Sequence, residues 1–134
     1  MTNHCTWPRA LCIVIAALLF SPLAALAAES YQLDPSFPRL PAGMKLGAVA
    51  GVATDSHGQV LVFHRGDPPL LVLDNHGTLH RSMGSGMFTS PHGLRVDRED
   101  NIWVTDNADH RVMKLSPDGK VLLTLGVRGK AGED

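Results

Sequence analysis

Residues 51–84, GVATDSHGQVLVFHRGDPPLLVLDNHGTLHRSMG, align without a gap with residues 93–126, GLRVDREDNIWVTDNADHRVMKLSPDGKVLLTLG. The two stretches are offset by 42 residues, and seven aligned pairs are identical, among them Asp55 with Asp97 and Gly77 with Gly119. A repeat of this length that is built from short apolar runs is typical of the blades of a β-propeller. The repeat therefore decides the fold class.

Each copy of the repeat contains four apolar runs separated by turn-forming residues. Gly77 and Gly119 lie in tight turns, where glycine adopts the positive φ that other residues avoid. No helical periodicity extends over three turns, so we predict an all-β chain. The expected strands cover Val49–Thr54, Val60–His64, Leu70–Leu73, Leu79–Met83, Leu94–Val96, Ile102–Thr105, Val112–Leu115 and Val121–Leu125.

These strands form two four-stranded blades over residues 48–134, whereas propellers close with four to eight blades. We therefore expect both outer faces of the pair to be bare and the chain to be the N-terminal piece of a longer propeller. The alternative is a small module that closes a ring by oligomerisation. In either case further blades, or further copies, are needed for closure.

The N-terminal segment differs from the repeats. An apolar run, Ala10–Phe20, is followed by small residues at Ala25-Leu26-Ala27, which predicts a secretory signal peptide over residues 1–27. Residues 28–47 then form an N-terminal arm. We expect a secreted or periplasmic protein that has no membrane attachment after cleavage.

Charge and cysteine content narrow the function. The chain has a formal net charge of −1 and no basic cluster, which argues against a nucleic-acid partner. Both cysteines, Cys5 and Cys12, lie in the predicted leader. The mature chain would therefore have neither a disulfide nor a thiolate metal site, and any metal would need histidine or oxygen ligands.

Two sequence motifs lie where predicted strands end or begin. The first is Phe63-His64-Arg65-Gly66-Asp67 and the second is Pro91-His92-Gly93-Leu94. Together with the NHL-type turns around them, they resemble the peptidyl-α-hydroxyglycine α-amidating lyases, which belong to the NHL-repeat six-bladed propellers. The resemblance covers Phe37 to Gly132.

The resemblance implies an enzyme that converts a peptide ending in α-hydroxyglycine into the peptide amide and glyoxylate. It implies that Arg65 is an active-site arginine and that His92 is one of three zinc-ligating histidines. It also implies that the backbone carbonyls of Val52 and Leu94 bind a structural calcium ion. The remaining site residues of that family lie in later blades, so the chain as given would be about two blades of six and inactive by itself.

General chemistry agrees with these roles. Three neutral imidazoles leave a fourth zinc position open for substrate or water, and calcium prefers carbonyl and carboxylate oxygens. A guanidinium such as that of Arg65 can form a bidentate pair with a carboxylate.

Each of these residues also has a purely structural interpretation. His92 could be a turn residue, and Arg65 could be a solvated residue at a strand end. His64 is expected to be structural, His110 to pack within a blade and Trp103 to lie in a blade core. Exposed turn histidines are expected at His57, His76 and His80, and hydrogen-bond acceptors at Asp55, Asp97 and Asp106, because aspartate bonds to the backbone that follows it.

Two other functions fit the same fold. One is a non-catalytic NHL propeller that binds a protein or a glycan, since fold alone does not define function. The other is a calcium-dependent lactonase, which the lack of an early metal-binding glutamate disfavours. The lyase interpretation instead requires a small-molecule or peptide substrate.

Overall fold

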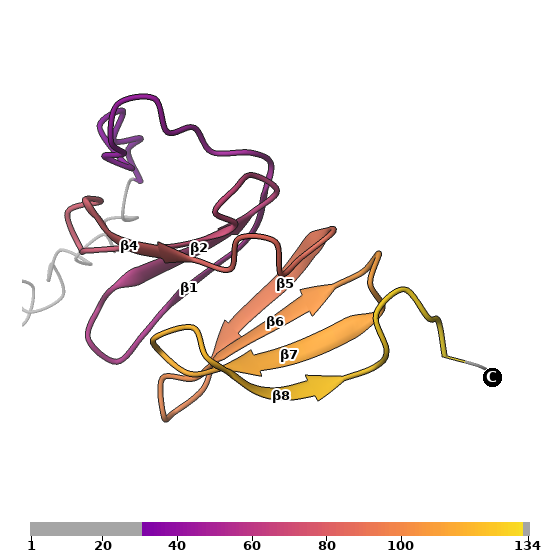
Figure 1. Cartoon of the computed structure of the whole chain (residues 1–134). Coiled ribbons are helices and arrows are strands. Elements are labelled where there is room, and N and C mark those ends of the chain that lie inside the picture. Colours follow the sequence, from indigo (N-terminus) through magenta and orange to yellow (C-terminus); the bar gives the residue numbers. More distant parts are fainter. Residues whose placement is uncertain (1–30, 133–134) are drawn as a thin grey trace, which may run out of the picture. The chain divides into compact units, whose positions relative to one another are not determined.

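The computed structural model describes residues 31–132 and consists of two four-stranded antiparallel sheets. The first sheet contains β1 (Val49–Thr54), β2 (Val60–His64), β3 (Leu70–Leu73) and β4 (Leu79–Met83) in that order. The second contains β5 (Pro91–Val96), β6 (Ile102–Asp106), β7 (Arg111–Leu115) and β8 (Val121–Leu125), again in chain order (Figure 1). The predicted all-β fold with two blade-like sheets is confirmed.

Five of the eight predicted strands have the predicted bounds, and three are longer. The second sheet extends to the pair Pro91 and Asp106 and to the pair Asp106 and Arg111. Proline is tolerated at Pro91 because it is the first residue of its strand, where a missing N–H disturbs the ladder least. The signal peptide predicted over residues 1–27 and the first residues of the arm lie outside the described residues.

The two sheets bury a shared apolar core. The face of the first sheet that presents Leu61, Phe63, Leu70 and Val72 packs against Leu94, Ile102, Val104, Met113 and Leu115 of the second. Alternate residues of a strand point to opposite faces, so β2 and β3 also have a second apolar face. Phe88, in the loop between the sheets, closes the core with an edge-on contact to Phe63 at a centroid distance of 5.0 Å.

The expectation that both outer faces are bare is wrong for the first sheet. Its second face presents Val62, Leu71 and Leu73, which are covered by Leu40, Met44 and Leu46 of the arm. The arm also bonds to the β3–β4 turn, because the Arg39 N–H donates to the Gly77 carbonyl at 2.7 Å. A proline-rich segment without strand periodicity thus covers the apolar face that a neighbouring sheet would otherwise cover.

The outer face of the second sheet has no such cover among the described residues. Leu123 and Leu125 on β8 are 41% and 51% exposed. Trp103 lies half-buried there, not in the blade core as predicted, and its indole N–H donates to Asp97 at 2.9 Å. Lys114 lies over the Trp103 ring and pairs with the same carboxylate. These contacts give the indole N–H a partner at the uncovered face.

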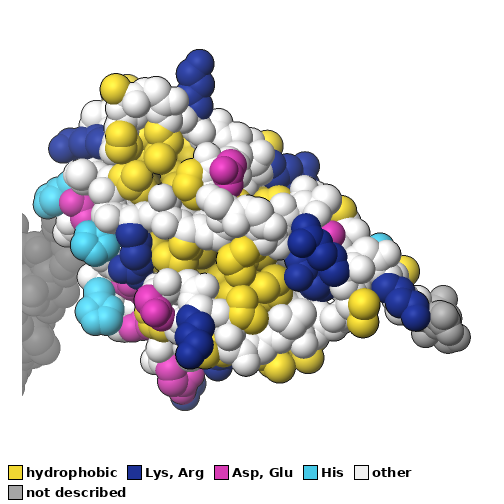
Figure 2. Space-filling model, viewed as in Figure 1, with side chains coloured by type: hydrophobic (Ala, Val, Ile, Leu, Met, Phe, Trp, Pro, Cys, Tyr) yellow, Lys and Arg dark blue, Asp and Glu magenta, His cyan; other side chains and the backbone are white. Residues whose placement is uncertain are grey.

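Charges on the face shown in Figure 2 are mixed. Lysine and arginine side chains alternate there with aspartate, glutamate and histidine and do not gather in one patch. Within residues 31–132 there is no helix long and apolar enough to cross a membrane.

Candidate functional site

The predicted site residue Arg65 directly follows β2 and is held by contacts to both sheets. Its backbone N–H donates to the Ala48 carbonyl at 2.9 Å, and its side-chain Nε donates to the Pro91 carbonyl at 3.2 Å. Its two Nη groups have no hydrogen-bond partner within residues 31–132. The guanidinium is therefore tethered at one edge, while the two donors that could bind a carboxylate remain available.

Arg65 borders a pocket of about 280 Å³ at the junction of the sheets. Asp67, Phe88 and Thr89 also line it, and Pro91 marks its border with β5. The sequence motifs contained Arg65 and Pro91, but Phe88 and Thr89 were missed because nothing in the linear pattern relates the loop before β5 to the end of β2.

His92 lies at a β-bulge. The register of β5 against β6 shifts between Pro91 and Gly93, which leaves His92 without a directly opposed partner. Bulges redirect side chains and occur often near functional sites. The imidazole is exposed, and none of its ring atoms has a hydrogen-bond partner in the described part of the chain.

The glycine after the bulge lies close to a side chain of the neighbouring strand. A Cβ atom at Gly93 would lie 2.7 Å from the Thr105 hydroxyl oxygen. In the first sheet a Cβ at Gly51 would lie 2.8 Å from the Cβ of Leu94. The Gly51 contact shows how closely β1 approaches β5, which brings the Val52 and Leu94 segments side by side.

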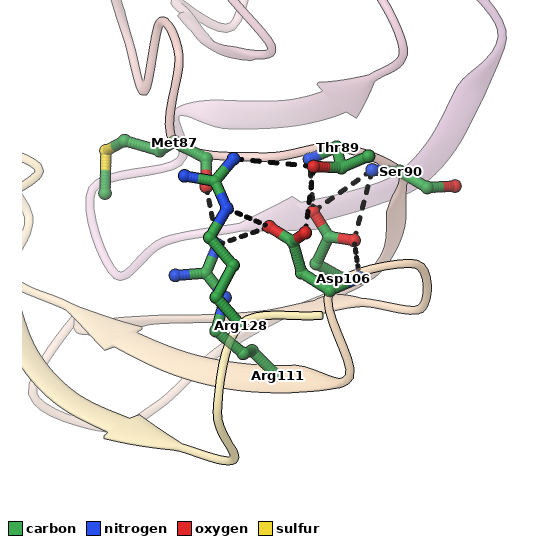
Figure 3. Close-up of polar contacts among 7 residues, drawn as sticks. Met87, Thr89, Ser90, Asp106, Arg111 and Arg128 are labelled. Atoms are coloured by element: carbon green, nitrogen blue, oxygen red, sulfur yellow. Dashed lines mark hydrogen bonds and ion pairs between the residues drawn. The ribbon is translucent and has the colours of Figure 1, made fainter. Parts of the chain in front are cut away.

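The network around Asp106 supports the pocket wall. Its carboxylate accepts the N–H groups of Thr89, Ser90 and Asp109 (Figure 3). Burial would raise the pKa of Asp106, but these backbone donors outweigh it and hold the pKa below its usual value. The side chain is 2% exposed, so these bonds fix the Thr89 side of the pocket.

Asp109 extends this network to two arginines. It accepts hydrogen bonds from Arg111 at 2.7 Å and from the Thr89 hydroxyl at 2.9 Å, and it pairs with Arg128 Nε at 3.1 Å (Figure 3). Arg111 also donates to the Met87 carbonyl at 2.8 Å. The loop that leads into β5 is thus held by buried charge-assisted bonds, which are stronger than neutral ones.

Other sequence expectations have mixed outcomes. His64 is structural, as predicted, and His57, His76 and His80 are exposed. Asp55 and Asp97 accept the turn N–H groups expected of them. His110 does not pack within a blade, because it is an exposed turn residue with a φ of 53°.

The residues implied for zinc fit only as part of a larger site. His92 offers one accessible imidazole, which suits zinc. However, no group of three histidine, cysteine, aspartate or glutamate residues within residues 31–132 is arranged to hold a metal ion. The described residues therefore do not form a three-ligand zinc centre by themselves.

The carbonyls implied for calcium fit poorly. Val52 and Leu94 occupy equivalent positions in β1 and β5. Yet the Leu94 carbonyl already accepts a hydrogen bond from Arg95 Nη1 at 2.9 Å. A calcium ion at this oxygen would meet the guanidinium charge while Arg95 makes this bond, so the calcium role of the two carbonyls stays a prediction.

Comparisons with known proteins agree with this fold. A family model described as "NHL repeat" matches residues 88–115. The structure titled "Streptogramin B lyase structure", a β-propeller, superposes with a TM-score of 0.52 at 19% identity, covering 63% of this chain and 28% of that one. This likeness supports the propeller fold alone.

Sequence relatives are more specific. The chain is 36% identical to "Peptidylglycine alpha-amidating monooxygenase" of Rattus norvegicus, over 66% of this chain and 12% of that protein. It is 37% identical to "Peptidyl-alpha-hydroxyglycine alpha-amidating lyase 1" of Drosophila melanogaster, over 62% of this chain and 20% of that protein. The resemblance seen in the sequence is confirmed, although the chain covers only a small part of either relative's length.

Proposed function

We infer that this homologue of the peptidyl-α-hydroxyglycine α-amidating lyases provides two blades of a lyase propeller, with Arg65 as the substrate-binding residue. The observation that supports this role most directly is the tethering of Arg65 through Nε to the Pro91 carbonyl, with both Nη groups available beside the pocket. Pro91 precedes His92 in β5, so the Arg65 side chain is bonded to the residue next to the proposed zinc ligand. The substrate would be a small molecule or peptide that ends in α-hydroxyglycine.

The chemistry follows from the substrate. The bond between the amide nitrogen and the hydroxyl-bearing carbon breaks, the hydroxyl loses its proton and the nitrogen gains one, which yields the peptide amide and glyoxylate. Arg65 would form a fork with the carboxylate that becomes part of glyoxylate and so orient the carbon that reacts. His92 would contribute one ligand to a zinc ion, whose chemistry is Lewis-acid activation of the substrate oxygens.

These two residues are not sufficient for catalysis. A catalytic zinc ion needs about three protein ligands, and the described residues offer one candidate, His92. We therefore propose that the chain alone is inactive and that its blades act within a larger propeller. We further propose that residues 1–27 direct secretion, which intact-mass measurement of the exported protein would test through loss of this segment.

A chimaera tests the lyase proposal. Residues 48–126 would replace the aligned segment of the Drosophila lyase, and glyoxylate release from an α-hydroxyglycine peptide would be measured together with zinc content. We expect an active chimaera in which His92→Ala loses zinc and activity together. Arg65→Ala should lose about a hundredfold in turnover while keeping zinc, since it removes a charge-assisted contact to substrate.

Matched controls separate these effects from general damage. His76→Ala and Arg98→Ala remove the same residue types from exposed turns and should change neither zinc nor turnover. A folded chimaera that binds zinc but is insensitive to Arg65→Ala would contradict the assigned role. A folded chimaera that neither binds zinc nor turns over would instead favour the non-catalytic module that binds a protein or glycan.

A further inference from the structure

The side chain of His64 lies between two backbone segments that flank Arg65. Its Nδ1 accepts the N–H groups of Gly47 and Gly66, each at 3.0 Å. The side chain is 1% exposed, so water does not compete for these bonds. One imidazole nitrogen therefore joins the end of the arm to the loop that follows β2. This pair of hydrogen bonds forms a clamp.

The same geometry determines the protonation of the ring. Because Nδ1 receives two N–H donors, it carries no proton, and the hydrogen of the neutral imidazole is on Nε2. Nε2 has no hydrogen-bond partner among the described residues. The Pro68 backbone also interacts with this imidazole and partly offsets the effect of burial on its pKa. The two well-formed hydrogen bonds of the ring are nevertheless both accepted at Nδ1.

The two glycines leave no room for another arrangement. A Cβ at Gly66 would lie 2.5 Å from the His64 ring, and one at Gly47 would lie 2.7 Å from the backbone carbon of Arg65. Gly47, His64 and Gly66 are thus mutually fitted. Together they fix the backbone on either side of Arg65, whose own N–H bonds to Ala48.

The second blade contains the same clamp built from a different residue. Asp106 is 42 residues after His64 and accepts the N–H of Thr89, which is 42 residues after Gly47. In both blades, the last residue of the second strand thus accepts hydrogen bonds from the loop that precedes the first strand. Only in the first blade is the next residue an arginine, since Asn107 takes that place in the second.

We propose that His64 is a positioning residue for Arg65, holding the loop so that the guanidinium faces the pocket. This inference rests on the proposed function for its catalytic consequence, but the clamp itself is a property of this chain. The proposal predicts that a hydrogen-bond acceptor at the place of Nδ1 is needed to hold the loop around Arg65, whereas the Nε2 end of the ring is not needed.

Two substitutions distinguish the two ends of the ring. His64→Asn places its amide oxygen where Nδ1 lies, and His64→Gln places its amide where Nε2 lies. In the full chain, hydrogen exchange of the Gly47 and Gly66 amides should remain as slow in the Asn variant as in the parent. In the Gln variant it should become about tenfold or more faster, because the acceptor is lost. Unprotected glycine amides in the parent chain would overturn the clamp.

Turnover in the chimaera tests the consequence for Arg65. His64→Gln should reduce glyoxylate release by about tenfold with zinc content unchanged, and His64→Asn should restore it. Faster amide exchange without any loss of turnover would overturn the positioning role. If His64→Gln does not fold, the Asn variant decides alone, because fast exchange at Gly66 in a folded Asn variant contradicts the proposal.

The two inferences fail in different ways. If the chimaera without further substitutions is inactive, the lyase proposal fails. If the Gly47 and Gly66 amides of the unsubstituted full chain still exchange slowly, the clamp stands independently of that failure.

Discussion

The two blades have the same strand order and the same β1–β2 and β5–β6 registers, yet they differ in what covers them and in what their equivalent positions present. The first sheet is covered on both faces, by the second sheet and by the arm, whereas residues 31–132 cover only one face of the second. At equivalent positions, Ala50 is replaced by His92 at the bulge and Arg65 by Asn107 after the second strand. The repeat thus preserves the backbone, and single substitutions within it produce the candidate site.

The largest expected effect is a loss of stability on substitution of Asp106, the residue of the second blade equivalent to His64. Asp106→Ala removes the acceptor of three backbone N–H groups, two of them in the loop before β5, and should lower the free energy of unfolding by about 3 kcal/mol. Asp106→Asn keeps one oxygen and should cost about half as much. Urea unfolding followed by circular dichroism measures both. Equal stability of the Ala variant and the parent would show that the loop is held by other contacts.

The glycines of the two innermost strands should be unequal although they occupy the same repeat position. Gly51→Ala places a methyl group 2.8 Å from Leu94 of the other sheet and should cost about 2 kcal/mol of stability by overpacking. Gly93→Ala meets the Thr105 side chain within its own sheet, which can rotate away, and should cost about half of that. Thermal unfolding of the two variants compares them directly. A larger loss in Gly93→Ala would mean that the two sheets do not approach most closely at Gly51.

The strands were predictable because turns and alternation are local. Asp55 accepts the N–H groups of His57 and Gln59, so the turn that ends β1 is encoded within five residues. The bulge at His92 was not predictable, since it depends on the register with β6 across the turn. The arm was predicted, but its packing against the first sheet was not, because its apolar residues have no period that relates them to Val62, Leu71 and Leu73.

The site was predictable in part. The motifs indicated Arg65 and His92 through resemblance, but they gave no reason for the tether to Pro91 or for the clamp at His64. Both are contacts between distant segments. The hydrogen bond of Arg95 to the Leu94 carbonyl likewise depends on a rotamer that the sequence does not specify.

The two clamps should respond to different ranges of pH. Burial lowers the pKa of His64 below its ordinary value of 6.5, so the folded state favours the neutral ring. The stability from this preference is present above pH 6.5 and is lost as pH falls through the lowered pKa. The pKa of Asp106 is lowered from 3.8, so its contribution is lost only at more acidic pH.

Exchange of the Gly66 amide should therefore accelerate, relative to the intrinsic rate, as pH falls below about 6.5, while that of Thr89 remains protected until the more acidic range in which Asp106 titrates. His64→Asn has no titrating group at this position and should abolish the difference between the blades. Parallel acceleration of both amides as pH falls below about 6.5 would show that the blades open together and not through His64.

The smallest expected effect concerns the carbonyls of Val52 and Leu94. Arg95 follows Leu94, whereas Ala53 follows Val52, so only the second blade places a guanidinium at this strand position. Because the Leu94 oxygen accepts a bond from Arg95 Nη1, calcium should bind the full chain only weakly. Arg95→Ala should increase calcium affinity by at most about fivefold, the range expected for one partly solvated charge. Isothermal titration of calcium into the parent and the variant measures this change, and Arg98→Ala, which removes an exposed turn arginine, is the matched control. A parent chain that binds calcium tightly would show that Arg95 leaves the carbonyl when the ion arrives, and the two blades would then differ less at this position than the structure indicates.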